Sequence, residues 1–234
     1  MKILAATNNK HKIGEFRNIL KDTGIQLISA DELGRKLPDI PEDGGTFEEN
    51  AGIKALGFAK FAGLTVIADD SGLEINALDG APGIYSARYA ETNDMRIERV
   101  LRELEGLKRR IGESENRSSP DKIGNRQSAI GNVPDRSARF VCVIALANPE
   151  NVIATFRGEV YGRIGYEPKG NGGFGYDPVF IPDGYDKTFA ELGADIKDRI
   201  SHRANALRKL DEYLKAGFVR KPATSDQRPV ISEQ

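Results

Sequence analysis

The 234-residue sequence has one cysteine, two histidines and no tryptophan. A single cysteine, Cys142, cannot form an internal disulfide, which is typical of proteins that fold in a reducing compartment. It lies in an apolar, strand-like run, so we expect a buried structural thiol rather than a nucleophile. Two histidines are too few for a histidine-rich zinc centre, and they argue against a Ser-His-Asp hydrolase.

Long hydrophobic runs are also missing. No segment approaches the roughly 18 consecutive apolar residues that a transmembrane helix needs. The apolar run near the N-terminus spans only a few residues, which is too short for the hydrophobic region of a signal peptide. We therefore expect a cytoplasmic protein that has no membrane partner.

The charges nearly cancel, which leaves no field of one sign to attract a polyanion. There are 34 Lys and Arg residues against 35 Asp and Glu residues, a formal net charge of -1. This balance disfavours binding to a nucleic-acid polymer. An apolar fraction of 39% is ordinary for a globular protein, and the length allows one large domain or two small ones.

Hydrophobic periodicity predicts both strands and helices. The clearest helix covers residues 47–62, because Thr46 and Glu49 have the spacing of a capping box and Gly63 is a stop signal. We expect strands at 2–6, 64–68, 73–77, 139–147 and 152–160, and further helices at about 13–20, 97–104 and 201–217. This mixture indicates an α/β fold built on a mixed sheet with flanking helices.

Two segments lack a core-forming pattern. Residues 107–137 are polar without a sustained period, and so long a loop inside a compact domain is either functional or disordered. Its excess of basic residues could contact an anionic partner, but we favour a disordered, solvated insertion. Residues 217–234 are expected to form a flexible tail. The rest, residues 1–216, is then one domain interrupted by the insertion.

The most informative motif is Asp69-Asp70-Ser71-Gly72, where an apolar run ends. Successive side chains of a strand face opposite sides of a sheet, so the two carboxylates cannot enter one pocket while the strand persists. We expect one of them to be a site residue and the other to be scaffold beside a Ser-Gly turn. The alternative is that both bind backbone amides in that turn.

The segment after the first strand could bind phosphate. Thr7, Asn8, Asn9 and Lys10 would lie at a helix N-terminus, where free amides and the helix dipole favour an anion. The segment lacks the glycine spacing of a P-loop. A helix cap with a solvated lysine is therefore the alternative.

Further along, Lys54 shares a face of the 47–62 helix with Asn50, and Glu42 lies in a turn just before that helix. Glu42 could ligate a hard cation or simply stay solvated. Mg²⁺ often takes one or two carboxylates together with substrate phosphates, so Glu42 and Asp70 would suffice as protein ligands. With Lys10 and Lys54 opposite the phosphate charge, the set resembles a metal-assisted phosphoanhydride hydrolase.

The second half contains a glycine-rich aromatic stretch that could hold a base. Its glycines allow close backbone approach, Phe174 and Tyr176 offer stacking surfaces, and Asp177 is an acceptor. Core aromatics beside a tight turn are the alternative. Possible donors follow near a helix start: Lys197, His202 and Arg203. They would suit the carbonyl edge of a purine, or they could satisfy a helix cap and an ion pair.

Five segments, taken in order, closely resemble the inosine triphosphate pyrophosphatase family: TNNKHKIGEF, TFEENAGIKA, ADDSGLEINALDGAPGIYSARYA, GNGGFGYDPVF and ISHRANAL. The match covers most of residues 1–106 and 138–216. It implies an elongated α/β structure with a mixed sheet and two lobes around a central nucleotide cleft, and a homodimer. It also implies Mg²⁺-dependent hydrolysis of the purine nucleoside triphosphates ITP, dITP and XTP to the monophosphate and pyrophosphate, which keeps deaminated purines out of DNA and RNA.

The resemblance also implies residue roles. Asp70 would be catalytic and would bind Mg²⁺ with Glu42, while Asp69 faces away and holds the turn. The phosphates would be bound by Thr7, Asn8, Asn9, Lys10 and Lys54. The remaining substrate contacts, chiefly to the base, would come from Ser71, Phe174, Gly175, Tyr176, Asp177, Lys197, Ser201, His202 and Arg203.

Two rival functions remain open from the sequence. A general nucleotide or sugar-phosphate hydrolase could use the same cleft, and a nucleotide-binding sensor could hold its ligand without cleaving it. Residues 107–137 form a much longer segment than the usual connection in the family, which leaves the geometry of any oligomer open.

Overall fold

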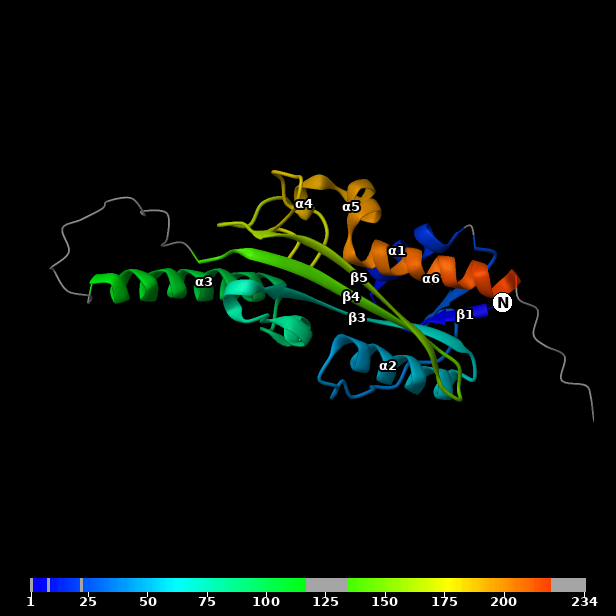
Figure 1. Cartoon of the computed structure of the whole chain (residues 1–234). Helices are drawn as coiled ribbons and strands as arrows, with labels where there is room; N and C mark the ends of the chain where they lie inside the picture. The colour runs from blue at the N-terminus through cyan, green and yellow to red at the C-terminus, as the bar shows by residue number, and fades with distance from the viewer. Residues whose placement is uncertain (1, 8, 22, 117–133, 220–234) are drawn as a thin grey trace, which may run out of the picture.

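The described residues form a six-stranded mixed sheet (Figure 1). The structure is a computed structural model that describes residues 2–7, 9–21, 23–116 and 134–219. The strand order is β2-β1-β3-β4-β5-β6; β1 pairs in parallel with β2 and β3, and the other pairs are antiparallel. The strands are β1 (Lys2–Ala5), β2 (Gln26–Ser29), β3 (Thr65–Ile75), β4 (Ser137–Ala147), β5 (Val152–Ile164) and β6 (Phe180–Pro182). The mixed sheet expected from the sequence is confirmed.

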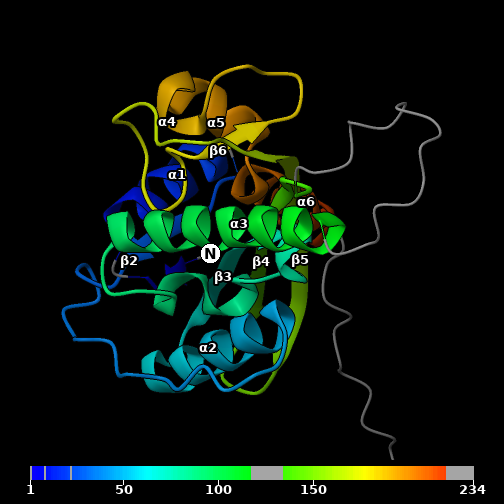
Figure 2. The ribbon, with the colours of Figure 1, turned by 90° about the vertical axis from the view of Figure 1, so that its left-hand side faces the viewer.

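Helices cover both faces of this sheet, as Figures 1 and 2 show. α2 (Phe47–Ala62) packs on one face, where Val143 of β4 belongs to its core. α1 (Lys10–Leu20) and α6 (His202–Val219) cover the other face around the next residue of β4, Ile144. The remaining helices are α3 (Asn93–Asn116), α4 (Phe189–Leu192), α5 (Ala194–Ile200) and the 3₁₀ helices η1 (Asn76–Leu78) and η2 (Gly83–Arg88). In the part of the chain that the structure describes, no helix is long and apolar enough to cross a membrane.

α2 has the boundaries that the sequence predicts. Thr46 Oγ1 accepts a hydrogen bond from Glu49 N at 3.1 Å, which satisfies one free amide of the first turn. Gly63 ends the helix in the left-handed region at φ 66°, and its N–H donates to Ala59 O. The side chain of Glu49 does not complete the capping box, because its Oε2 accepts from Gly45 N instead, at 2.6 Å.

β3 differs from the sequence prediction. Two strands separated by a Ser-Gly turn were expected, but a single strand continues through Ser71 and Gly72, and its pairing with β4 is unbroken from Val66 to Ile75. The glycine has another purpose. A Cβ at position 72 would lie 2.3 Å from Gly83 O, so only glycine lets η2 cross the strand there.

The prediction of a structureless 107–137 segment is wrong at both ends. Residues 107–116 continue α3, because Lys, Arg and Glu are good helix formers that extend a helix without an apolar face. Arg136 is buried, and its Nε donates to Ile164 O at 2.8 Å, which anchors the start of β4. Residues 117–133 lie outside the described residues. Residues 217–219 of the expected tail belong to α6, and the rest of that tail is also outside the described residues.

Cys142 is a structural side chain, as expected. It is fully buried on the α6 side of the sheet. Burial, together with the nearby Asp69 carboxylate, raises the pKa of its thiol to about 12, so the nucleophilic thiolate does not form near neutral pH.

Candidate functional site

The two adjacent aspartates lie on the central strand β3 and face opposite sides of the sheet. Asp70 points to α2, where it meets Lys54. Asp69 points to α1 and α6, where it meets Lys12 and Arg203. The prediction that the two carboxylates separate is therefore confirmed, although the alternation of an unbroken strand achieves it rather than a turn.

Asp70, Lys54 and Glu42 form a compact group on the α2 side. Lys54 Nζ lies 3.0 Å from Asp70 Oδ1 and 3.1 Å from Glu42 Oε1. Asp70 Oδ2 is buried and has no hydrogen-bond partner among the described residues. Lys54 belongs to a depression of about 250 Å³ whose polar lining is Thr7, Lys12, Asp39, Glu42, Lys54 and Asp69. We call this the acidic depression.

Burial and charge act in opposite directions on this group. Burial raises the pKa of Asp70, and the neighbouring Lys54 ammonium only partly offsets that effect. Burial alone would lower the pKa of Lys54, but the carboxylates of Asp70, Asp69 and Glu42 outweigh it and raise the pKa. Lys54 therefore stays charged, and Asp70 accepts a proton more readily than an ordinary aspartate.

Asp69 is locked into an ion-pair network on the other face. Lys12 Nζ lies 2.8 Å from its Oδ2, Ser71 Oγ donates to the same oxygen at 2.8 Å, and Arg203 Nε is 3.6 Å away. Burial would raise the pKa of Asp69, but the positive charges of Lys12 and Arg203 overcome it and hold that pKa well below its usual range. This carboxylate is ionised at neutral pH and orders the cations around it.

A larger pocket of about 550 Å³ opens on the Asp69 side, and we call it the aromatic pocket. It lies between Ser71 and Gly72 of β3 and the 173–177 segment. Its lining includes Asn9, Lys12, Ser71, Ser86, Arg96, Phe174, Gly175, Tyr176, Asp177, Lys197, His202 and Arg203. Lys12 lines both this pocket and the acidic depression, so the two form neighbouring parts of one site.

Lys197 organises the aromatic end of this pocket. It is buried, its Nζ lies 2.5 Å from Asp177 Oδ2, and it sits 4.4 Å from the centroid of the Phe174 ring. Asp177 Oδ2 also accepts from Phe174 N at 2.8 Å. A side chain at Gly173 would meet that carboxylate at 2.0 Å, so the glycine lets the backbone fold around Asp177. The aromatic face is thereby held in a fixed orientation.

His202 and Arg203 are both buried at the start of α6. The His202 ring stacks on Phe140 with centroids 4.8 Å apart, and its Nδ1 has no hydrogen-bond partner among the described residues. Arg203 is 1% exposed, and it pairs with Glu15 of α1 as well as with Asp69. Burial, followed by the charges of Arg203 and Lys197, lowers the pKa of His202 well below its usual value. The imidazole is therefore neutral near pH 7.

This shift predicts a pH-dependent stability. The unfolded chain binds a proton at His202 below pH of about 6.5, whereas the folded chain does not, so stability is present above that pH and falls on acidification. Between pH 6.5 and 5.5, the wild type should lose up to about 1 kcal/mol more unfolding free energy than His202→Asn. Urea titrations at both pH values measure this difference. Equal losses in the two proteins would show that His202 does not stay neutral on folding.

Several predicted site residues have structural partners. Tyr176 is buried in the apolar core beside β6, and its hydroxyl donates to Ser86 O at 3.0 Å. Ser201 Oγ caps α6 by accepting from Ala204 N at 3.1 Å. Gly175 has a φ of 64°, which favours glycine. The alternative of a core aromatic beside a tight turn is therefore confirmed for Tyr176, and both Tyr176 and Gly175 also line the aromatic pocket.

The segment predicted to bind phosphate is only partly brought to the site. Thr7 lines the acidic depression and Asn9 lines the aromatic pocket. Lys10 is exposed and lines a third hollow with Gly14 and Arg17, which shares Thr7 with the acidic depression. Asn8 lies outside the described residues.

The model of the Ham1 family matches residues 3–120 and 110–213 of this sequence. The chain belongs to the Ham1 family. It is 45% identical to the dITP/XTP pyrophosphatase of Oceanobacillus iheyensis over 216 residues, which cover 91% of this chain and 98% of the relative. It is 43% identical to the dITP/XTP pyrophosphatase of Bacillus subtilis over 216 residues, 91% of this chain and 96% of the relative.

Solved structures agree with these relatives of the Ham1 family. A HAM1 protein from Coxiella burnetii aligns with a TM-score of 0.73 at 40% identity, over 92% of this chain and 99% of the other. The Staphylococcus aureus Ham1 protein aligns with the same TM-score and identity over 93% and 100%. The resemblance drawn from the five sequence segments is confirmed.

Two site residues of this Ham1 protein were missed from the sequence. Lys12 contacts Asp69 and lines both parts of the site, and Glu15 pairs with Arg203. A signal for Lys12 was present, because it stands four residues before the buried Phe16 and therefore shares the sheet-facing side of α1. Glu15 left no comparable signal, since its partner lies 188 positions away in sequence.

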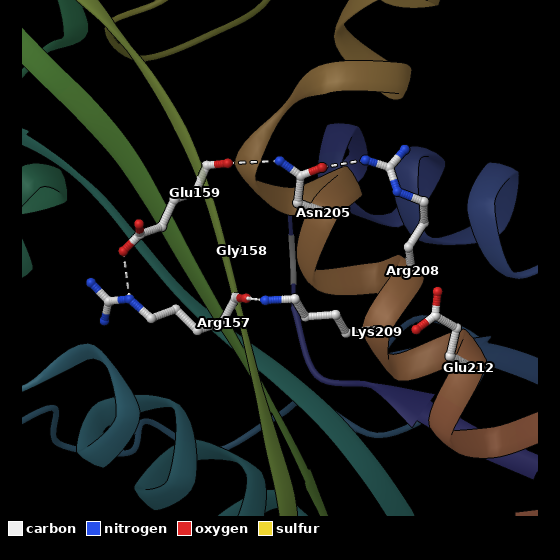
Figure 3. Close-up of a pocket in the computed structure, with 7 residues that line it drawn as sticks. All are labelled: Arg157, Gly158, Glu159, Asn205, Arg208, Lys209 and Glu212. Atoms are coloured by element: carbon white, nitrogen blue, oxygen red, sulfur yellow. Dashed lines mark hydrogen bonds and ion pairs between the residues drawn. The ribbon is translucent and has the colours of Figure 1, made fainter. Parts of the chain in front are cut away.

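A further concavity of about 550 Å³ lies along the outer edge of β5, against α6 (Figure 3). Lys209 Nζ donates to Arg157 O and Asn205 Nδ2 to Glu159 O, each at 2.6 Å. Arg157 Nε also pairs with Glu159 Oε1 at 2.7 Å. These side chains already bind protein groups, and those from α6 cover the free edge of β5 in this Ham1 fold.

Proposed function

We propose that this chain is a nucleoside-triphosphate pyrophosphatase that converts dITP, ITP and XTP to the monophosphate and pyrophosphate. Two relatives that align over more than 90% of the chain carry the name dITP/XTP pyrophosphatase. The observation that carries the proposal within the molecule is the contact of Lys54 with both Asp70 and Glu42, beside a pocket suited to a flat base.

The residues present fit Mg²⁺. Asp70 keeps a buried oxygen that has no hydrogen-bond partner in the described part of the chain, and Glu42 contacts the same Lys54 ammonium group. Among the described residues, no group of three or more His, Cys, Asp or Glu side chains is placed to hold a metal. Two carboxylates suit Mg²⁺ that completes its shell with water and phosphate oxygens. When bound, Mg²⁺ would neutralise charge on the phosphate oxygens.

The protein side chains would divide the remaining work. Asp70 orients the attacking water through its free oxygen and accepts its proton, which its raised pKa favours. Lys54 and Lys12, together with Thr7 and Asn9, face the triphosphate and stabilise the charge of the leaving pyrophosphate. Lys12 takes this place better than the exposed Lys10, because it lines both parts of the site.

Base selection would come from the aromatic pocket. A purine that stacks on Phe174 would bring its 6-oxo group to the donors Lys197 and Arg203. Adenine presents an amino group at that position, which would meet these donors with another donor instead of an acceptor. Ser71, Asp177, Ser201 and the neutral His202 would hold the pocket and its remaining polar edge.

We extend the proposal to a cytoplasmic homodimer without a nucleic-acid or membrane partner. The low net charge and the resemblance of the five sequence segments support this extension. Sedimentation of the purified chain tests the dimer directly.

One assay separates this function from its rivals. Purified protein with Mg²⁺ should release pyrophosphate from dITP and XTP with kcat/KM at least about 100-fold above the value for dATP. Removal of divalent ions with EDTA should abolish turnover, and added Mg²⁺ should restore it. Equal rates on all nucleotides would indicate a general hydrolase. Binding of dITP without release of pyrophosphate would indicate a sensor.

A further inference from the structure

The loop that carries Glu42 is attached to the first turns of α2. Gly44 N donates to Asn50 Oδ1 at 2.9 Å, and Gly45 N donates to Glu49 Oε2 at 2.6 Å. One turn after Asn50, Lys54 reaches back to Glu42 at 3.1 Å. Three side chains of one helix therefore hold a single short loop.

Asn50 is an unusual residue for its place. It is fully buried beside the apolar face of α2, and its Nδ2 has no hydrogen-bond partner among the described residues. A buried amide with an unsatisfied donor is costly, whereas an apolar side chain of similar size would fill the same space without that cost. The hydrogen bond to the loop gives a reason for the polar side chain.

Gly44 matches Asn50 from the other side of this contact. A Cβ on Gly44 would lie 2.8 Å from Asn50 Oδ1 and 2.7 Å from Glu49 Cβ. Only a glycine lets the loop backbone lie this close to the helix. The Gly44 amide is thus fixed against α2, and Glu42 stands two residues earlier on the same short loop.

We propose that Asn50 is a positioning residue for the proposed metal site. It acts through the Gly44 amide to hold the Glu42 carboxylate opposite Asp70, and it does not touch the substrate itself. The inference rests on the proposed function for its catalytic readout. The placement of the loop and the binding of a metal ion can be measured without substrate.

Asn50→Leu removes the acceptor and keeps the branched shape and the number of side-chain heavy atoms. We expect the Mg²⁺ concentration for half-maximal dITP hydrolysis to rise at least about tenfold, the size typical when a residue that orients a metal ligand is lost. KM for dITP at saturating Mg²⁺ should change less than threefold. Asn50→Asp keeps the acceptor for Gly44 N, so we expect it to preserve the protection of the Gly44 amide from hydrogen exchange, which Asn50→Leu should abolish.

Two further measurements decide between a positioning role and a general packing role. Direct Mn²⁺ binding, followed by electron paramagnetic resonance without nucleotide, should weaken at least about tenfold in Asn50→Leu. In a Glu42→Gln background, the same substitution should change Mn²⁺ affinity less than twofold, because the residue that Asn50 positions no longer carries a charge. An equal loss in both backgrounds would overturn the proposal.

Gly44→Ala provides a second variant in case Asn50→Leu does not fold. The added methyl group pushes the loop off α2 without altering the buried helix face, so it should weaken Mn²⁺ binding to a similar degree. Unchanged Mn²⁺ affinity in this variant would also overturn the proposal. If the variants show these losses of Mn²⁺ affinity but the wild-type protein releases no pyrophosphate, the proposed function is refuted and the positioning role of Asn50 stands.

Discussion

Asp70→Asn should lower kcat for dITP by roughly 1,000-fold, because the amide keeps the shape of the side chain but can neither accept a proton from water nor bind Mg²⁺ with a full charge. The assay is pyrophosphate release at saturating Mg²⁺. Asp43→Asn is the matched control, since Asp43 is exposed on the loop that carries Glu42. It should stay within about twofold of wild type, as surface changes usually do.

Folding should survive the Asp70 substitution. The pKa of Asp70 is raised by burial, so its charged form is disfavoured in the folded protein and any stability that it contributes is lost as the pH rises through that pKa. A neutral amide avoids this cost, and Lys54 keeps Glu42 as its partner. A folded Asp70→Asn protein that retains activity within tenfold of wild type would remove Asp70 from the catalytic role.

Asp69→Ala, in contrast to Asp70→Asn, should strongly lower the stability of the fold. Removing this carboxylate leaves the buried Arg203 and the largely buried Lys12 without their shared partner, and breaking such a buried pair costs about 3–5 kcal/mol. Urea denaturation at pH 7 measures the loss. The low pKa of Asp69 means that its contribution is present above about pH 4 and disappears only on further acidification.

The control for Asp69 is an aspartate in a weak, exposed pair. The carboxylate of Asp186 lies 3.9 Å from Arg163 and is fully exposed, so Asp186→Ala should leave the denaturation midpoint unchanged. If Asp69→Ala loses no more stability than this control, the network around Asp69 does not stabilise the fold.

Local rules predicted much of the fold. The helix at 47–62 was readable from its cap and stop residues, because these act within one turn. The side-chain alternation of a strand also separated Asp69 from Asp70 correctly. The prediction of a Ser-Gly turn was wrong because Gly72 makes room for η2, which begins eleven residues later in the chain. A turn and a close approach between two segments both require glycine, so the sequence alone does not distinguish them.

The candidate site was predictable where each residue lies in an element with a clear local sequence pattern. Glu42, Lys54 and Asp70 come from a loop, a helix and a strand that follow one another, and the structure brings them together. Lys12 and Glu15 contact partners far along the chain, so no local pattern marks these contacts. The sequence pointed to Lys10 as the phosphate-binding lysine after the first strand. Which lysine faces the sheet depends on the phase of α1, which starts at residue 10.

The outer edge of β5 limits how copies of this chain could associate. β6 pairs only with Gly162, Arg163 and Ile164, so the long remainder of β5 would otherwise be a free template for another strand. The amide of Asn205 and the ammonium of Lys209 already hold the carbonyls of Glu159 and Arg157. A strand from a second molecule could pair with this part of β5 only by displacing the α6 side chains. These contacts therefore disfavour an intermolecular sheet, and with it fibril growth, along this edge.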